Sequence, residues 1–310
     1  MDPMTLLGRV GFPSDGWVVE DLAHTRWLTP GIWQLQRGEE RRVLKWLSAA
    51  RSLGETAWEA HWSARSAEQT RWNYWAREAL AYKSNLPTRH FGGPDGFDAP
   101  NCITCEVTEH DAVLLLEFVD GVAAEHWTIN EYGDAARNLG AVHSRAIFPV
   151  EPWLSRHFIR DYSTGSSAIW TSGPRISFAG RTVESRSFDW AFVGQGAIGE
   201  DIGNLISDAA FDHFVSANQL PELEASVLTG YITGLRAGGW DGDHTEVRRN
   251  VWASAVKYDW LTPQLLERAS ASTHLRYGGV EEIDAKHLFR ERGLALEFSL
   301  SRALKALEHL

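Results

Sequence analysis

The sequence predicts an α+β protein with two lobes, a small β-rich N-terminal lobe and a larger, mainly helical C-terminal lobe. Three observations predict this arrangement. Short β-prone runs separated by Gly, Pro or polar turns occupy much of the first 118 residues. Beyond them, apolar side chains recur at three- and four-residue steps, which is typical of amphipathic helices. The length of 310 residues fits two lobes at roughly 150 residues per domain. We therefore expect lobes at 1–118 and 119–310, with a cleft between them.

The N-terminal lobe is predicted to contain five strands and one long helix. Apolar side chains at helical spacing predict the helix over residues 55–84. Pro87 and the Gly-rich residues 92–96 then end it. Runs of β-branched and aromatic residues bounded by turn residues predict the strands: residues 16–19, 31–35, 42–47, 103–108 and 112–118.

The C-terminal lobe is predicted to be a set of helices. The first begins with a capping box at Thr128 and Glu131, in which the Thr oxygen and the Glu carboxylate satisfy free backbone donors reciprocally. Residues 176–185 flank a Gly-Arg pair and predict a hairpin. Apolar periodicity predicts the remaining helices: residues 152–162, 200–215, 222–238, 246–270 and 284–310.

The charge and the cysteine content argue against several classes of function. Acidic residues number 41 and basic residues 30, so the net charge is −11, which argues against a nucleic-acid partner. No apolar run approaches the ~18 residues of a membrane helix, and the N-terminus lacks the pattern of a signal peptide. We therefore expect a cytoplasmic protein without membrane association. Cys102 and Cys105 lack the second ligand pair of a zinc site, so we interpret them as free thiols on a strand.

The most informative stretch surrounds Asp189. This carboxylate follows Phe188 at the end of a short apolar segment, and a Gly-rich turn and an amphipathic run with Asp201 come after it. The pattern resembles the metal-binding Asp segment of the aminoglycoside phosphotransferase and choline kinase-like superfamily, which has a two-lobed protein-kinase-like fold. Further family-like segments are spread over nearly the whole chain: residues 31–33, 77–82, 139–140 and 258–261.

The resemblance implies a nucleotide site between the lobes and a small-molecule substrate. Kinases of this shape place a Lys on the third strand and a Glu on the following helix to hold phosphates, and the matching residues are Lys45 and Glu78. Glu117 falls in the connector whose backbone would face an adenine. Asp189 would hold a metal ion if a Mg-nucleotide binds. Asp201 matches an acid that steadies the catalytic loop in this superfamily, and on the residues alone it is equally a helix cap.

One departure from the family pattern affects the chemistry. The superfamily carries a His-x-Asp-x-x-x-x-Asn catalytic loop, and this pattern occurs nowhere in the 310 residues. Counting back from Asp189 places Ala168 at the His, Trp170 at the Asp and Arg175 at the Asn. Because the Asp serves the acceptor hydroxyl and the Asn binds a metal ion, we expect ordinary phosphoryl transfer to be absent or very slow. The cofactor stays open: the resemblance implies Mg-ATP, and the missing loop argues against its ordinary use.

Three functions are compatible with these residues. The favoured one is an enzyme that has lost ordinary phosphoryl transfer and uses the inter-lobe cleft for another reaction on a small molecule, such as acid–base or cyclisation chemistry. Asp189 would then carry the proton, and Arg175 or His157 would steady a negative charge. The second is an ATP-dependent phosphotransferase of the aminoglycoside type with a non-standard base. The third is a pseudokinase that binds a ligand or a partner protein without catalysis.

Overall fold

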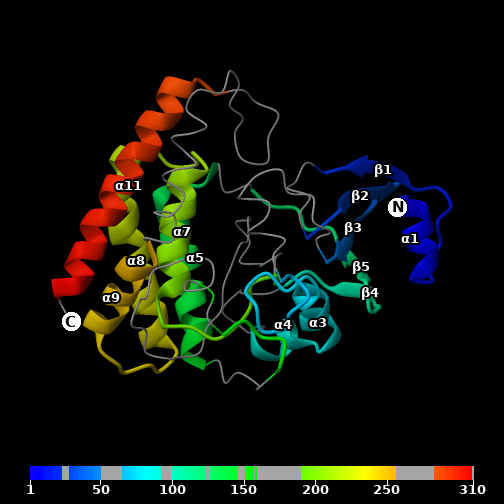
Figure 1. The fold of residues 1–310 in the computed structure, drawn as a ribbon, viewed down its shortest axis with the longest axis horizontal. Coiled ribbons are helices and arrows are strands. Elements are labelled where there is room, and N and C mark those ends of the chain that lie inside the picture. The colour runs from blue at the N-terminus through cyan, green and yellow to red at the C-terminus, as the bar shows by residue number, and fades with distance from the viewer. Residues whose placement is uncertain are drawn as a thin grey trace.

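The computed structural model describes residues 1–22, 28–49, 65–91, 99–122, 126–145, 151–156, 158, 190–255 and 283–308. Within them, a small sheet lies at one end of the molecule and a set of long helices at the other (Figure 1). This is the two-lobed α+β fold that the sequence predicts. No described helix combines the length and the apolar character needed to span a bilayer.

The described part of the chain forms one five-stranded antiparallel sheet in the order β1-β2-β3-β5-β4. All five predicted strands are confirmed, with small shifts at their ends. The register sets Lys45 beside Ile32 and Leu114 on the neighbouring strands, so this lysine lies in the interior of the sheet. The strands are β1 (Val18–Asp21), β2 (Gly31–Arg37), β3 (Glu40–Ser48), β4 (Cys102–Val107) and β5 (Asp111–Glu117).

Helices cover the sheet and build the rest of the described fold. Those over residues 129–145, 200–211, 220–237, 244–255 and 285–308 confirm the predicted helices where these are described. The helices are α1 (Pro3–Arg9), α3 (Arg77–Lys83), α4 (Leu86–His90), α5 (Ile129–Arg145), α7 (Glu200–Phe211), α8 (Leu220–Ala237), α9 (His244–Ala255) and α11 (Ala285–Glu308), with a 3₁₀ turn at Ala217–Gln219.

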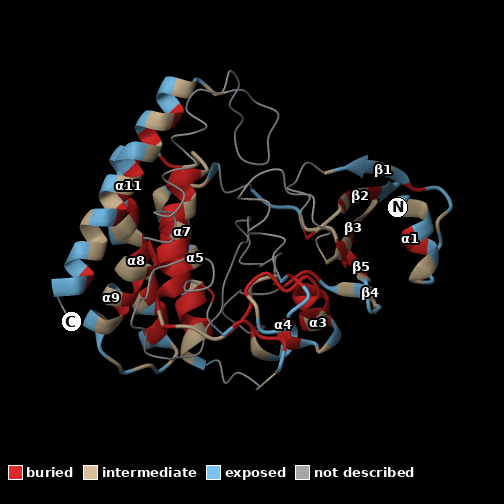
Figure 2. Ribbon diagram, in the orientation of Figure 1, coloured by how far each residue is buried: buried red, intermediate tan, exposed pale blue. Residues whose placement is uncertain are grey.

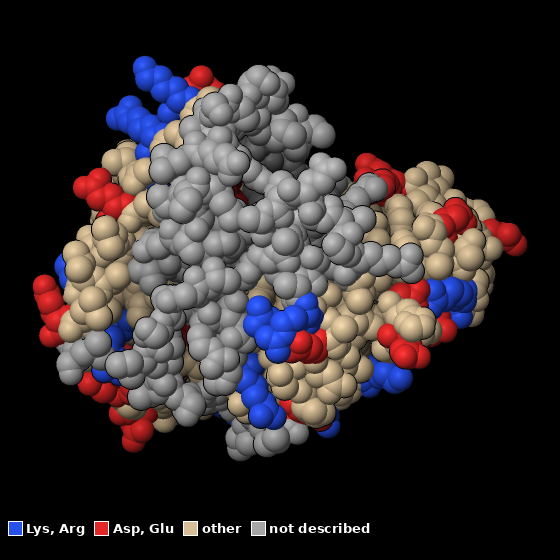
Figure 3. Space-filling model, viewed as in Figure 1, with Lys and Arg blue, Asp and Glu red and all other residues tan. Residues whose placement is uncertain are grey.

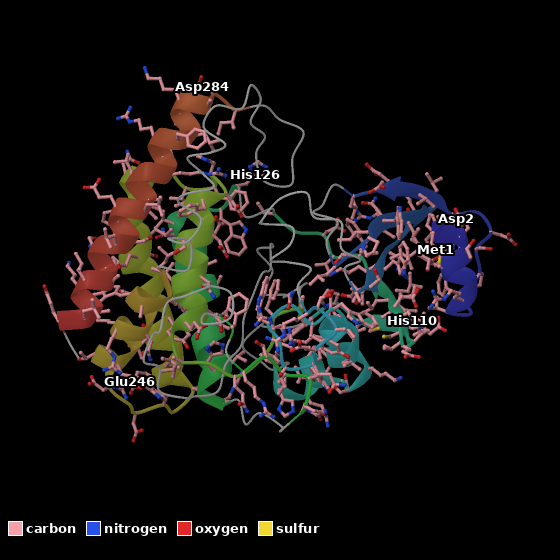
Figure 4. The ribbon with its side chains drawn as sticks, viewed as in Figure 1. Met1, Asp2, His110, His126, Glu246 and Asp284 are labelled. Carbon is pink, nitrogen blue, oxygen red and sulfur yellow. The ribbon has the colours of Figure 1, made fainter. Side chains whose placement is uncertain are left out.

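Helix α1 is an addition to the predicted elements. Its N-terminus is capped by Asp2, whose carboxylate accepts the backbone N–H of Thr5 at 2.9 Å. At its other end Arg9 donates to the carboxylate of Asp111 at 2.7 and 3.0 Å, and this guanidinium holds the pKa of Asp111 at about 2. Figure 4 shows His110, in the β4–β5 turn, on the same side of the molecule as Met1 and Asp2. The helix buries leucines in an apolar cluster on one face of the sheet: Leu6, Leu7, Trp17, Trp33, Leu35, Leu44, Val113 and Leu115.

The helix predicted over residues 55–84 is wrong in much of its described part. Residues 65–76 form turns, and α3 is the only regular helix between residues 65 and 84. Arg65 has a positive φ of 57°, and the side chain of Arg77 uses carbonyl oxygens of residues 69, 71 and 72 as acceptors. Those carbonyl oxygens therefore accept hydrogen bonds from a buried guanidinium and not from the backbone N–H groups of a helix. The apolar spacing that suggested a helix reflects burial in the core instead.

The helical part is built around the close packing of α5 against α8. Where the two helices touch, a Cβ on Gly140 would collide with the carbonyl oxygen of Tyr231, and one on Gly234 with that of Arg137. Only glycine lets the two backbones approach this closely. Figure 2 shows α7 largely buried, whereas α11 has one face exposed. The capping box is confirmed: Glu131 accepts the N–H of Thr128 at 2.6 Å, and Thr128 accepts the N–H of Glu131 at 3.3 Å.

A second correction concerns residues 152–162. The described residues 152–156 form a turn and an isolated parallel bridge, in which Ser155 pairs with Gly194. The Ser155 N–H donates to Val193 O at 3.1 Å, and Ser155 O accepts from Gln195 N–H at 2.6 Å. A Cβ on Gly194 would overlap the backbone of Ser155, so this pairing requires glycine. The bridge ties the segment after Asp189 to the chain before it, which local periodicity does not reveal.

Candidate functional site

Lys45 and Glu78 form a buried ion pair between the sheet and helix α3. Alternation along β3 places Val43, Lys45 and Leu47 on the face toward α3, because side chains two apart share one face of a strand. The Lys45 ammonium donates to Glu78 Oε1 at 2.6 Å. The two side chains are 11% and 2% exposed. The structure therefore places side by side the two residues that the sequence analysis paired.

Such a pair is costly to bury. Removing an ammonium and a carboxylate from water costs several kcal/mol for each ion, and their attraction offsets this cost only when the geometry is good. An apolar pair of similar volume would often serve stability as well or better. The short contact and the near-complete burial of Glu78 thus favour a role for this pair beyond holding the lobe together.

Arg77, the residue before Glu78, is held quite differently. Its five N–H groups all donate to main-chain carbonyl oxygens, and no carboxylate among the described residues pairs with it. It is fully buried, and burial lowers its pKa to about 9, which leaves it charged at neutral pH. The acceptors are Trp153 O at 2.8 Å, Trp72 O at 2.7 Å, Ala191 O at 2.8 Å, Gln69 O at 3.1 Å and Arg71 O.

These acceptors make Arg77 the clamp for the segment that follows Asp189. Ala191 lies two residues after Asp189, and Trp190, the residue between them, is fully buried with its ring 4.6 Å from that of Phe91. Arg77 also reaches Trp153, which belongs to the turn bridged to Gly194. The described flank of Asp189 is therefore fixed from α3, the same helix that carries Glu78.

A buried polar cluster that the sequence did not predict lies among α5, α7 and α8. Tyr231 of α8 and His143 of α5 approach at 2.6 Å, between the hydroxyl and Nδ1, and the Gly199 N–H donates to the same hydroxyl at 3.2 Å. The other ring nitrogen of His143 lies 3.7 Å from Asp201 Oδ2. The only signal in the sequence was a His, a Tyr and an Asp within separate amphipathic helices, and their helical spacing alone does not bring them together.

Burial decides the charge state of this cluster. It lowers the pKa of His143 to about 3, so the imidazole is neutral at pH 7 and the 3.7 Å contact with Asp201 is not an ion pair. Burial also raises the pKa of Tyr231 well above its ordinary value, and the Asp201 carboxylate adds to this. The Tyr231 hydroxyl therefore keeps its proton and can donate it to Nδ1 in the tautomer that has the His143 proton on Nε2, toward Asp201. The N-cap of α7 is Gly199 at a φ of 94°, with no side-chain cap, so the cap interpretation of Asp201 is wrong.

The remaining predicted site residues have separate outcomes. Asp189, Arg175 and His157 lie outside the described residues, and their roles stay predictions. Glu117 ends β5 half-buried; its backbone N–H donates to Asn101 O at 2.9 Å, and its carboxylate accepts from the Asn101 side chain. The described residues hold no group of three or more His, Cys, Asp or Glu side chains that could bind a metal ion. Of the predicted site residues that the structure describes, Lys45 carries the one positive charge.

The fold is similar to that of one solved kinase structure. No family model matches the sequence, and no curated protein matches it significantly. The structure is similar to that of the amicoumacin kinase hAmiN in complex with AMP-PNP, Ca2+ and Ami, with a TM-score of 0.55 and 11% identity over 96% of this chain and 94% of that one. The aminoglycoside phosphotransferase APH(4)-Ia also aligns, at 12% identity over 98% and 96% of the chains, but its TM-score of 0.47 adds no support. The chain therefore has the protein-kinase-like fold, as the sequence resemblance implies.

Proposed function

We propose that this protein binds a nucleotide through Lys45 in a kinase-like inter-lobe site and acts on a small molecule without ordinary phosphoryl transfer. The observation that carries the proposal is the buried contact of 2.6 Å between Lys45 and Glu78. Phosphoryl-transfer proteins use such a lysine to hold nucleotide phosphates and such a carboxylate to orient it. When bound, the nucleotide would supply a phosphate-rich anchor within the site.

The chain's own residues have distinct parts in this proposal. Lys45 holds the phosphates, and Glu78 keeps its ammonium in place from α3. The hydrogen bonds to Asn101 order the backbone around Glu117. In this proposal that backbone binds the adenine of the nucleotide. Asp189 is the proposed metal ligand, on a flank that Arg77 fixes through Ala191 O at 2.8 Å.

Loss of ordinary catalysis rests on the sequence. Phosphoryl transfer needs a group that orients the acceptor hydroxyl and a second metal ligand, and no His-x-Asp-x-x-x-x-Asn pattern supplies them. The small-molecule substrate is supported by the fold of hAmiN, whose structure was determined with AMP-PNP and Ami. Acidic and basic side chains are intermixed over the described part of the face in Figure 3, and the net charge of −11 gives no support to a nucleic-acid partner.

The test is a calorimetric titration of the full chain with ATP, with and without magnesium. The informative variant is the double substitution Lys45→Met with Glu78→Leu, which removes both charges together and so avoids leaving one of them buried alone. Lys83→Met is the matched control, because Lys83 is an exposed lysine on α3, the helix that carries Glu78. We expect the wild type and the control to bind alike and the double variant to lose at least about tenfold in affinity, or about 1.4 kcal/mol.

A parallel assay follows transfer of the γ-phosphoryl group to hydroxylated acceptors. Turnover is expected far below the roughly 1–100 per second of ordinary kinases. Wild-type protein that binds no nucleotide, or a double variant that binds as well as wild type, would overturn the nucleotide site. Turnover in the ordinary range would contradict the proposed loss of catalysis. It would then support the alternative of an ATP-dependent phosphotransferase.

A further inference from the structure

Cys102 and Cys105 lie on the same face of strand β4, contrary to their spacing. Residues three apart on a regular strand point to opposite faces, because side chains alternate. Here the register shifts between Cys102 and Thr104, so that Ile103 is the extra residue of a β-bulge. The bulge reverses the alternation at this point, and Ile103 is left 41% exposed.

The partners on β5 show the result directly. Cys102 lies opposite Leu116 and Cys105 lies opposite Leu114, two positions that share one face of β5. Both cysteines, together with Val107, pack against the core cluster that includes α3. The pair therefore forms a dithiol on one surface of the sheet, which the Cys-x-x-Cys spacing in a strand would not have indicated.

Each thiol has a defined environment, and both are free and half-buried. The Cys105 thiol donates to Ala79 O, on α3, at 3.6 Å. Cys102 lines a cavity of about 250 Å³ whose wall also includes Tyr82, Asn85 and Asn101.

The two thiols also differ in acidity. Hydrogen bonding with Cys102 lowers the pKa of Cys105, against the effect of burial, and the nearby Lys83 cation lowers it further. The same contact raises the pKa of Cys102. Since the thiolate is the nucleophile, this difference favours Cys105 for the first attack.

We propose that Cys102 and Cys105 form a thiol–disulfide modification site that is oxidised by a hydroperoxide. The Cys105 thiolate attacks one peroxide oxygen, the O–O bond breaks, and with hydrogen peroxide hydroxide leaves, giving the sulfenic acid. The Cys102 thiol then attacks the Cys105 sulfur, the S–O bond breaks, and water leaves as the disulfide forms. In sum, two thiols and one hydrogen peroxide give one disulfide and two waters. The proposal does not rest on nucleotide binding, so each proposal can fail without the other.

The strand geometry allows the bond to form. Positions opposite Leu116 and Leu114 correspond to two residues of strand, about 6.8 Å between Cα atoms at the usual rise, which lies within the ~4.4–6.8 Å range of disulfides.

Oxidation also has a consequence for helix α3. The hydrogen bond from Cys105 to Ala79 O is lost when its sulfur carries no proton. Ala79 follows Glu78, so this loss occurs one residue from the ion pair with Lys45. We expect faster amide hydrogen exchange in α3 of the oxidised protein than in the reduced protein, with α8 as the internal reference. Identical exchange in α3 would show that oxidation is not transmitted to the helix.

The experiment treats reduced full-length protein with hydrogen peroxide, then alkylates the remaining thiols and maps peptides by mass spectrometry. We expect a mass loss of about 2 Da on oxidation, for the two hydrogens of the thiols, and a Cys102–Cys105 link that dithiothreitol reverses. Phenylarsine oxide, which bridges neighbouring thiols, is expected to protect both cysteines of the reduced protein from alkylation.

The single variants separate the two roles. Cys102→Ser is expected to stop at the sulfenic acid, which dimedone traps on Cys105, whereas Cys105→Ser reacts at least about tenfold more slowly. Serine is close to cysteine in size, and a thermal melt of each variant controls for folding. Two free thiols after complete peroxide treatment, or a disulfide only between molecules, would overturn the proposal. Faster sulfenic acid formation in Cys105→Ser would overturn the assignment of the nucleophile.

Discussion

Helix α3 carries two consecutive buried ions, and the structure holds them in opposite ways. Arg77 directs all five N–H groups to main-chain oxygens on both sides of the helix, including Trp153 and Ala191 far along the chain. Glu78 turns toward the sheet and binds the ammonium of Lys45. One residue thus joins α3 to the turns around residues 69–72, 153 and 191, and the next joins it to the strands.

The difference indicates which residue is structural and which suits a ligand. A guanidinium that bonds five carbonyls cannot take a new partner without leaving one of them unsatisfied, at a cost of about 1–3 kcal/mol for each buried group. An ammonium on a flexible stem can rotate its three donors toward a phosphate while it keeps its carboxylate. We therefore regard Arg77 as the fixed point of the site and Lys45 as its binding group.

The largest effect is expected from Arg77→Met. It removes five hydrogen bonds and leaves several buried carbonyl groups without a donor, so a loss of at least about 4–5 kcal/mol in the free energy of unfolding is expected. Urea denaturation followed by tryptophan fluorescence measures it. Arg77→Lys, which keeps the charge, is the control and should lose less. A loss under about 1 kcal/mol in Arg77→Met would mean that the carbonyl network is not needed for the fold.

Lys45→Met comes next. The Glu78 carboxylate then stays buried without the Lys45 ammonium, and removing one member of a buried ion pair costs about 3–5 kcal/mol in comparable cases. Adding Glu78→Leu should recover most of this loss, since an apolar pair is often as stable as a buried ion pair. A double-mutant cycle in urea measures both changes. If the double variant is as unstable as the single one, the pair is a structural requirement, and the contrast with Arg77 disappears.

A smaller effect is expected at His143, which should make the free energy of unfolding depend on pH. Burial lowers its folded pKa to about 3, against about 6.5 in an unfolded chain. Between these values the unfolded state binds the proton and the folded state does not, so stability is full above pH 6.5 and falls as the pH drops. About 2 kcal/mol should be lost by pH 5, at 1.36 kcal/mol for each pH unit. Wild type and His143→Gln, melted from pH 7.5 to 5, should converge as the pH falls; parallel curves would contradict the shift.

The smallest effect is expected from an exposed ion pair on helix α5. Arg137 of α5 pairs with Asp134 at 2.6 Å, but the side chains are 53% and 65% exposed. Exposed helical pairs contribute about 0.3–0.5 kcal/mol, so Arg137→Gln should change the unfolding free energy by no more than this. The urea midpoints of wild type and variant at low and high salt measure it. A loss above about 1 kcal/mol in the free energy of unfolding would contradict the expectation that exposed ion pairs contribute less than buried ones.

Local sequence patterns were sufficient for much of the fold. Strands β3 and β5 follow from short apolar runs between turns, and α5 follows from the capping box at Thr128 and Glu131 together with its apolar period. These elements depend on neighbours a few residues apart, and a linear pattern records them. The pair of Lys45 and Glu78, 33 residues apart, followed instead from the resemblance to kinases, which place a Lys on the third strand and a Glu on the following helix.

The tertiary structure decided what depends on contacts distant in the sequence. Residues 65–76 have helical apolar spacing, yet the guanidinium of Arg77 captures their carbonyls and they form turns. His143, Asp201 and Tyr231 become one cluster only because glycines let α5 and α8 pack at backbone contact. Cys102 and Cys105 share a face only because of the bulge against β5. Periodicity reports which side of an element is buried, whereas the partner across the interface, and any break in the period, is set by packing.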